Sequence, residues 1–330
     1  MTVSIIVPAY NSAAYLSAAL QSLSAQTEPD IEIIVVNHES TDDTLRIAET
    51  HAAQDARIRV FTKPNTGTPA ASRNYGLRAA RGEYVTFLDA DDLYHPEKVA
   101  LQLQALQKYP ELDVVFCDVV QFTTDPYDPN NACYLRDRDF VNVAAEHLEQ
   151  LAGNLYGCRD SFYRFMSTRF TCLSTQGVFM RRRVLQQETL WFDENFLIGE
   201  DIDLWFRLAR RTKISYINQP LSYYRHHETS ITNDSEAYVR GTIAAHNGNL
   251  ARGMDVFSAA DVALLRHQLA GHYFDLAYLR FLALDMRAAR ASYRQARDYD
   301  AAVFSRSAYL KTFIPRALVK ILWRKKQNGL

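Results

Sequence analysis

Three carboxylates fall within four residues, Asp89-Ala90-Asp91-Asp92, directly after an apolar run at 84–88 that is typical of a buried strand. Carboxylates gathered at such a place repel one another and lose hydration, so their ionised forms are costly without a counter-charge. Mg²⁺ and Mn²⁺ bind carboxylate oxygens and commonly keep phosphate oxygens as further ligands. The cluster therefore indicates a metal and diphosphate site. The alternative interpretation is a solvated acidic turn that caps a helix beginning at Pro96.

Strand and helix patterns alternate over roughly the first 120 residues. The expected strands lie at 3–7, 31–36, 58–61, 84–88 and 113–118, with helix starts near residues 11, 40 and 69. This alternation predicts an α/β fold with a mostly parallel sheet and helices on both faces. Ligands of such sheets bind beyond the carboxyl ends of the strands, where the acidic cluster lies.

The pattern changes twice along the chain. Residues 121–170 are irregular, and from about residue 235 apolar residues recur at helical spacing while Gly and Pro are scarce. We therefore expect one domain at 1–230, with a nucleotide-binding half at about 1–120 and an acceptor half at about 121–230. A helical C-terminal region follows at 231–330.

Bulk properties exclude several classes of protein. The formal net charge is −1, so no global field favours nucleic acid. The four cysteines lack CxxC spacing, which favours reduced thiols in a cytoplasmic protein. No apolar run approaches the ~20 residues that span a bilayer, and the N-terminus follows a strand pattern without a charged leader.

Five ordered blocks carry a family resemblance. They read VSIIVPAYN at 3–11, EIIVVNHESTDDT at 32–44, NTGTPAASRNYGLRAARGEYVTFLDADD at 65–92, FDENFLIGEDIDLWFRL at 192–208 and YRHHETSIT at 224–232. In this order they closely resemble the family 2 glycosyltransferases, which are inverting, nucleotide-sugar-dependent enzymes with the GT-A fold. The resemblance implies transfer of a sugar from a nucleotide diphosphate donor to an acceptor hydroxyl.

The acidic cluster matches the DxD motif of that family. The resemblance implies that Asp91 is a metal ligand for Mn²⁺ or Mg²⁺. It implies that Asp89, with the adjacent Ala90, lies on the donor side, where Asp89 meets the ribose or supports the metal. Asp92 is either an outer support of the metal or a helix cap. The cation would stabilise charge that develops on the leaving diphosphate.

An Arg-x-His element of the family matches Arg225 and His227. A guanidinium pairs with phosphate oxygens and a neutral imidazole ligates metals, so we expect Arg225 on the donor and His227 on the cation. The adjacent His226 leaves open which imidazole points inward.

Asp201 matches the catalytic base of the family. An inverting transfer needs one carboxylate to accept the proton of the attacking hydroxyl. An apolar helix pattern follows, so Asp201 should lie near a helix N-terminus, which favours its ionised form. Glu200 and Asp203 are acceptor-side candidates, and Asp203 is the main rival for the base.

Other motif positions match donor-binding residues of the family. Pro8, Ala9 and Tyr10 sit where the first strand of the family meets the nucleotide, although Tyr10 could instead be a core aromatic. Arg73 and Asn74 match an Arg-Asn pair near the diphosphate or sugar. Arg73 on a helix face could equally form a surface salt bridge.

One departure from the family concerns the base. Many relatives carry Asp-Asp-Gly-Ser where this chain has Asn37-His38-Glu39-Ser40, and the second Asp commonly contacts uracil. His38 replaces an acceptor-only carboxylate with an imidazole, which puts UDP in doubt as the donor nucleotide. Glu39 replaces Gly, which argues against a positive φ there.

These observations predict a metal-dependent, hexosyltransferase-type enzyme acting on a glycan or lipid-linked acceptor in cell-surface polysaccharide or glycolipid biosynthesis. The alternative is a non-catalytic nucleotide-sugar or carbohydrate-binding relative. A nicotinamide dehydrogenase is disfavoured because the first glycine of the chain is Gly67.

The segment 310–330 is basic and amphipathic. Six cations without an acid lie at 311–326, interleaved with apolar residues. Such a segment could lie peripherally on the inner face of an anionic membrane. Equally, it could be a terminal helix packed on its domain with a solvated tail.

Overall fold

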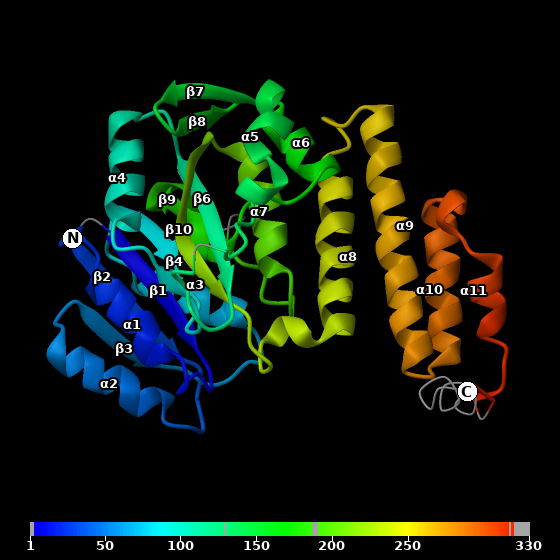
Figure 1. Cartoon of the computed structure of the whole chain (residues 1–330), viewed down its shortest axis with the longest axis horizontal. Coiled ribbons are helices and arrows are strands. Elements are labelled where there is room, and N and C mark those ends of the chain that lie inside the picture. Colours follow the sequence, from blue (N-terminus) through cyan, green and yellow to red (C-terminus); the bar gives the residue numbers. More distant parts are fainter. Residues whose placement is uncertain (1–2, 129, 187–190, 317, 320–330) are drawn as a thin grey trace. The chain divides into compact units, whose positions relative to one another are not determined.

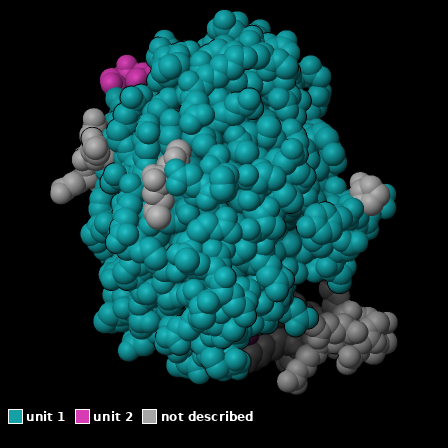
Figure 2. Space-filling model, turned by 90° about the vertical axis from the view of Figure 1, so that its left-hand side faces the viewer, with its two compact units in different colours: residues 1–230 teal, residues 231–330 magenta. Residues whose placement is uncertain are grey.

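The computed structural model describes residues 3–128, 130–186, 191–316 and 318–319. It divides into two compact units, Met1–Ser230 and Ile231–Leu330, which Figure 2 colours separately. Each is described below by itself.

The first unit is built around one sheet, whose described strands run in the order β3-β2-β1-β4-β9-β6-β10-β8-β7, with β5 paired to β10 (Figure 1). The strands are β1 (Val3–Ala9), β2 (Ile31–Asn37), β3 (Ile58–Thr62), β4 (Tyr84–Phe87), β5 (Leu93–Tyr94), β6 (Val114–Phe122), β7 (Leu148–Ala152), β8 (Leu155–Cys158), β9 (Val178–Arg181) and β10 (Ile214–Arg225).

The α/β fold class is confirmed, with one refinement of the sheet. Strands β3, β2, β1 and β4 are parallel, as is the β6–β10 pair. Strand β9 runs antiparallel between β4 and β6, and β5, β7 and β8 add further antiparallel ladders. The sheet is therefore mixed, and the expected parallel pairing is correct mainly for the N-terminal half.

Helices cover both faces of this sheet, as the alternation predicted. Strand β1 is apolar except for Ser4, because it is buried on both sides. Ile6 packs in one core with α3 and α7, while Ile5 and Val7 pack in the other with α1 and α4. The helices are α1 (Leu16–Ser24), α2 (Thr44–Gln54), α3 (Pro69–Ala79), α4 (Lys98–Lys108), α5 (Phe140–Val143), α6 (Phe162–Thr168) and α7 (Glu200–Arg211).

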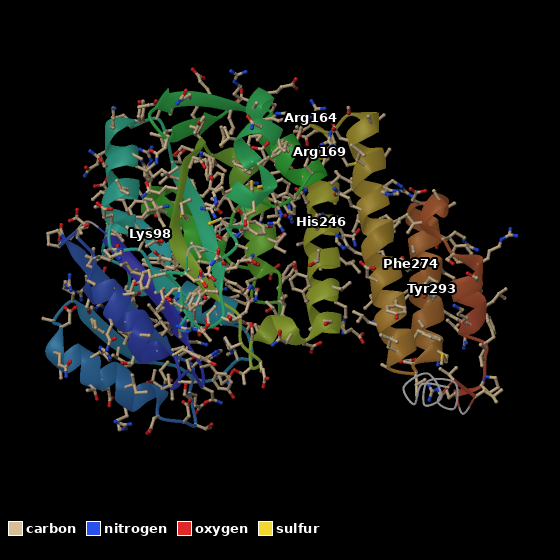
Figure 3. All side chains as sticks on the ribbon, in the orientation of Figure 1. Lys98, Arg164, Arg169, His246, Phe274 and Tyr293 are labelled. Carbon is tan, nitrogen blue, oxygen red and sulfur yellow. The ribbon has the colours of Figure 1, made fainter. Side chains whose placement is uncertain are left out.

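The described part of the second unit is helical. It contains α8 (Ser235–Arg252), α9 (Ala259–Leu282), α10 (Met286–Tyr299) and α11 (Arg306–Lys311). Ser258 and Asp261 form a reciprocal capping box that starts α9. Phe274 of α9 packs edge to face on Tyr293 of α10, with ring centroids 5.2 Å apart (Figure 3).

Among the described residues, no helix is both long enough and apolar enough to cross a bilayer. Of the basic segment 310–330, residues 320–330 lie outside the described residues, so the expectation of a membrane-binding helix is not tested there.

Candidate active site

The acidic cluster forms a turn at the carboxyl end of β4, where the Asp92 amide donates to the Asp89 carbonyl at 3.1 Å. Asp92 is only 1% exposed, and its Oδ1 accepts the Arg225 amide at 2.9 Å. Its Oδ2 has no hydrogen-bond partner among the described residues. Burial raises the pKa of Asp92 strongly, and the charges of Asp91 and Asp89 raise it further. A solvated cap is therefore excluded, and the following helix begins at Lys98.

His227 is the histidine that reaches this cluster. Its Nε2 lies 2.8 Å from Asp91 Oδ2, and its ring packs against Tyr15 with centroids 4.5 Å apart. The His226 ring instead packs on Tyr224 at 4.9 Å. The structure thus settles which of the adjacent imidazoles points toward the acidic turn.

Arg225, the last residue of β10, also holds the acidic turn. Its Nε donates to the Asp91 carbonyl at 2.8 Å, and its guanidinium lies 4.6 Å from the Phe122 ring centroid and 5.2 Å from that of Tyr15. Burial raises the pKa of the Asp91 carboxyl, and the neighbouring Asp89 charge adds to this. The turn therefore concentrates carboxylates that favour an added positive charge.

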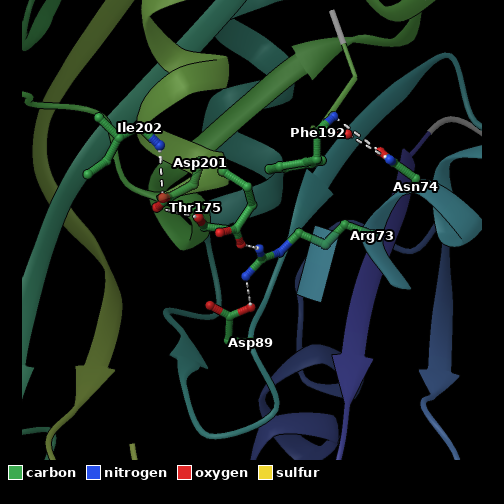
Figure 4. A network of polar contacts seen from close by, with 8 residues as sticks. Arg73, Asn74, Asp89, Thr175, Phe192, Asp201 and Ile202 are labelled. Atoms are coloured by element: carbon green, nitrogen blue, oxygen red, sulfur yellow. Dashed lines mark hydrogen bonds and ion pairs between the residues drawn. The ribbon is translucent and has the colours of Figure 1, made fainter. Parts of the chain in front are cut away.

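Arg73 joins the acidic turn to the start of α7 (Figure 4). Its guanidinium donates to Asp89 Oδ1 at 2.6 Å and to Glu200 Oε1. The side chain is 5% exposed, so this is a buried ion pair and not a surface salt bridge. Burial opposes the charge of Arg73, but Asp89 and Glu200 outweigh it and raise the pKa. One cation therefore positions two carboxylates that are far apart in sequence.

Asp201 begins α7 beside Glu200, after Gly199 turns the chain at φ +92°. Its Oδ1 accepts the Ile202 amide at 2.8 Å, and Thr175 donates to Oδ2 at 3.3 Å (Figure 4). Burial raises the pKa of Asp201 above the ordinary range. Burial also raises that of Glu200, to about 7, although Arg73 opposes the shift. This pair can hold a proton near neutral pH.

Asp203 and Asn74 make structural contacts. Asp203, 3% exposed, accepts from Arg207 Nε at 2.8 Å one turn along α7. Asn74 is clasped to the Phe192 backbone, donating to its carbonyl at 2.8 Å and accepting from its amide at 3.2 Å. Donor contact by Asn74 and an acceptor role for Asp203 stay predictions.

Tyr10 and His38 lie together beyond the ends of β1 and β2. Tyr10 is 50% exposed, so it is not a core aromatic. His38 is 4% exposed and its Nε2 accepts the Thr66 amide at 2.7 Å. Burial and the Lys63 charge lower the pKa of His38, so the imidazole is neutral near pH 7. Its amide donates to the carbonyl of Ala9, which with Pro8 ends β1.

The expectation for Glu39 is wrong. Its φ is +55°, in the left-handed region that glycine adopts at least cost. Its Oε2 accepts the Asn65 amide at 3.1 Å. A loop-to-loop hydrogen bond thus helps to hold a backbone conformation that is strained for a residue with a Cβ.

Sequence reasoning missed two supporting residues, Thr175 (labelled in Figure 4) and Lys98 (labelled in Figure 3). Lys98 is fully buried, and its Nζ donates to Gln102 at 2.7 Å and to Thr86 of β4 at 3.2 Å. Gln102 donates to the Gly177 carbonyl at 2.8 Å, within the 3-10 turn that carries Thr175. No local signal marked either residue, because the turn is irregular and Lys98 lies on an ordinary amphipathic helix.

No group of three or more His, Cys, Asp or Glu side chains converges on a metal position within the described residues. Asp91 Oδ2 and His227 Nε2, 2.8 Å apart, are the kind of donors that a hard or borderline cation accepts. Adjacent octahedral ligands at about 2.1 Å from a metal are separated by about 3 Å, so the pair fits two ligands of one cation.

Comparison with known proteins places this chain in a family. The profile of glycosyl transferase family 2 matches residues 4–186, more than half of the chain. The chain belongs to glycosyl transferase family 2. The Bacillus subtilis uncharacterized glycosyltransferase EpsJ is 34% identical over 235 residues, covering 70% of this chain and 62% of EpsJ. Streptococcus pneumoniae glycosyltransferase GlyG is 28% identical over 271 residues, covering 80% of this chain and 84% of GlyG.

Other family 2 members are much longer than the match. An uncharacterized glycosyltransferase of Rickettsia felis is 31% identical, but the match covers 68% of this chain and 33% of that protein. The crystal structure of S. aureus TarS 1-349 in complex with UDP has a TM-score of 0.62 at 20% identity, covering 100% of this chain and 92% of that chain. At that identity the likeness shows the fold.

Proposed function

We propose that this family 2 protein is an inverting, metal-dependent glycosyltransferase that moves a hexose from a nucleotide diphosphate donor to an acceptor hydroxyl. The observation that carries this is the Arg73 bridge, which brings the acidic turn at Asp89 beside the carboxylates of Glu200 and Asp201. A cation-binding turn and a proton-accepting pair therefore share one end of the sheet.

On the donor side, Asp91 and His227 hold the cation, and Asp92 keeps the turn anchored to Arg225. The cation, when bound, supplies positive charge beside the departing diphosphate. Asp89 begins this turn and accepts from Arg73, and it meets the donor ribose or supports the metal. Ala90 separates Asp89 from Asp91 in the turn and also lies on the donor side.

On the acceptor side, Asp201 is the base. Its Oδ1 accepts the Ile202 amide, and among the described residues its Oδ2 accepts one long hydrogen bond, from Thr175 at 3.3 Å. Oδ2 therefore takes the proton of the attacking hydroxyl. The raised pKa of Asp201 makes it a stronger proton acceptor than an exposed carboxylate. Glu200 holds Arg73 in place.

The nucleotide base lies near Pro8, Ala9, Tyr10 and His38. TarS structures are in complex with UDP and UDP-GlcNAc, which supports a nucleotide-sugar donor. The acceptor is a glycan or a lipid-linked saccharide, and the protein acts on it in the cytoplasm, at the inner face of a membrane. Segment 310–330 would provide peripheral contact.

A thermal-shift screen of nucleotide diphosphates with and without Mn²⁺ tests donor binding, since a ligand that prefers the native state raises its stability. We expect one base to stabilise the protein in a Mn²⁺-dependent way, followed by sugar transfer to a lipid-linked or glycan acceptor. Failure of every nucleotide to bind would contradict the donor site. Binding without transfer to any acceptor would instead favour a non-catalytic relative.

A further inference from the structure

The helical unit contains a cavity of about 370 Å³ between α8, α9 and α10, a size typical of small-molecule sites. Ile243 and Leu276 form part of an apolar lining. The polar side chains that line it are Arg240, Asn247, Tyr273, Arg280, Ser292 and Gln295. The cavity thus combines an apolar surface with several hydrogen-bonding groups, all from 240–295.

The cavity has a surplus of positive charge. Arg280 donates to Glu236 Oε1 at 3.0 Å and to Ser292 Oγ at 2.9 Å. Among the described residues, Glu236 is thus the one carboxylate that binds the Arg280 guanidinium. Arg240 is exposed, and among the described residues its side chain forms no hydrogen bond or ion pair. Two guanidinium groups therefore meet one carboxylate, which favours an oxyanion ligand.

The opposite wall is polar and well supported. Asn247 Oδ1 accepts from the Tyr299 hydroxyl at 2.5 Å, and one N–H of its Nδ2 donates to the Tyr273 hydroxyl at 3.5 Å. The rings of Tyr273 and Tyr299 stack with centroids 5.3 Å apart. The Gln295 side chain is exposed and, within the described part of the chain, has no hydrogen bond. The side-chain amides of Gln295 and Asn247 can form hydrogen bonds with the hydroxyls of a ligand. The edge of the Tyr273 ring and the side chain of Ile243 can contact its C–H groups.

We propose that the α8–α9–α10 cavity binds a saccharide that bears an anionic group. Arg240 and the free edge of the Arg280 guanidinium bind the oxyanion, and Asn247 and Gln295 bind ring hydroxyls. The anion has two sources, a sugar phosphate or the carboxylate of an acidic sugar. Because every residue involved lies in the helical unit, binding can be measured without nucleotide, metal or sugar transfer.

Calorimetric titration of the full chain with glucose 1-phosphate and with glucuronate, without nucleotide or metal, tests this cavity. We expect saturable binding of at least one of them, weaker binding of inorganic phosphate, and none of glucose. Arg240→Gln should weaken affinity about tenfold, because one charge-assisted contact is lost. Arg287→Gln is the matched control, since Arg287 is an exposed arginine of α10 that does not line the cavity.

Amide hydrogen exchange on the same complexes locates the ligand, with slower exchange expected at 240–247 and 291–295. Binding of glucose 1-phosphate would identify the anionic group as a phosphate, and binding of glucuronate would identify it as a carboxylate. Equal affinity for inorganic phosphate and the sugar phosphate would remove the saccharide from the proposal. Binding that is unchanged in Arg240→Gln, or reduced as much in Arg287→Gln, would overturn the site altogether.

Discussion

Arg73 binds Asp89, 16 residues later in the chain, at 2.6 Å, and its other terminal nitrogen binds Glu200, which lies 127 residues after Arg73. This guanidinium connects the acidic turn after β4 to the start of α7. Because the bridge is buried, removing one partner would leave uncompensated charge, which is strongly destabilising. The relative position of the acidic turn and the start of α7 is therefore set by the ion pairs of Arg73.

Asp91→Ala is expected to abolish metal-dependent binding of the donor nucleotide while the protein stays folded. The variant removes one of the two donor atoms that lie 2.8 Å apart, and it relieves repulsion from Asp89. Calorimetry of the nucleotide diphosphate with Mn²⁺ measures the effect, and the exposed Asp128→Ala is a control. Wild-type affinity in the Asp91 variant would remove this residue from the metal site.

Asp201→Asn should leave donor binding intact and reduce transfer by at least ~10², because an amide cannot accept the proton. Since the pKa of Asp201 is raised, wild-type transfer should fall on acidification at a pH above the ordinary range of an aspartate. Asp203→Asn is the informative comparison: its contact with Arg207 predicts lost stability with little change in turnover. Wild-type turnover in Asp201→Asn would transfer the role of base to another carboxylate.

The fold could largely be predicted from sequence because its signals are local. The apolar run of β1 and the turn at Asp89 are contiguous, and five ordered blocks lie within 3–232. Strand β9 was missed because Val178–Arg181 pairs only with segments distant in sequence, β4 and β6. No periodicity within four residues predicts such a strand.

The site could be predicted less completely, because its support is non-local. Motifs pointed to Asp91 and Asp201, but the contact of Arg73 with Glu200 depends on the tertiary fold. For Glu39, the residue type itself led to the wrong prediction of the backbone conformation. Its left-handed backbone follows from the loop in which it lies, and the intrinsic preference of its side chain does not decide it.

His38→Asp should shift selectivity toward UDP over other nucleotide diphosphates. The neutral imidazole is buried and accepts the Thr66 amide, so it offers less accepting capacity to a base than a carboxylate would. An aspartate would also gain a cation partner in Lys63, which lies 3.1 Å from His38 Nε2. Competition binding measures the shift, with His38→Asn as the uncharged control. A wild type that already prefers UDP strongly would contradict this role of His38.

Lys98→Met should change how stability depends on pH. Burial lowers the pKa of Lys98 from its ordinary value of 10.5 to about 8, so the folded protein loses this proton before the unfolded chain does. Stability of the wild type should therefore rise relative to the variant between pH 8 and 10.5, by up to about 3 kcal/mol. Urea unfolding across this range measures it, with exposed Lys108→Met as control. Parallel stability curves would show that Lys98 does not titrate there.

The last prediction concerns the basic C-terminal segment. Thr312 and Val319 are 1% and 3% exposed, and the Thr312 carbonyl accepts from Arg290 at 2.7 Å, so the described start of the segment is packed. Deleting 320–330 therefore tests membrane binding without removing these contacts. Each cation near anionic lipid contributes about 1 kcal/mol, so the deletion should reduce sedimentation with anionic vesicles. High salt should do the same to the full chain by screening surface charge. Turnover of the deletion variant on a short acceptor that does not partition into the membrane should persist. Equal binding of the full chain to neutral and anionic vesicles would contradict an electrostatic role.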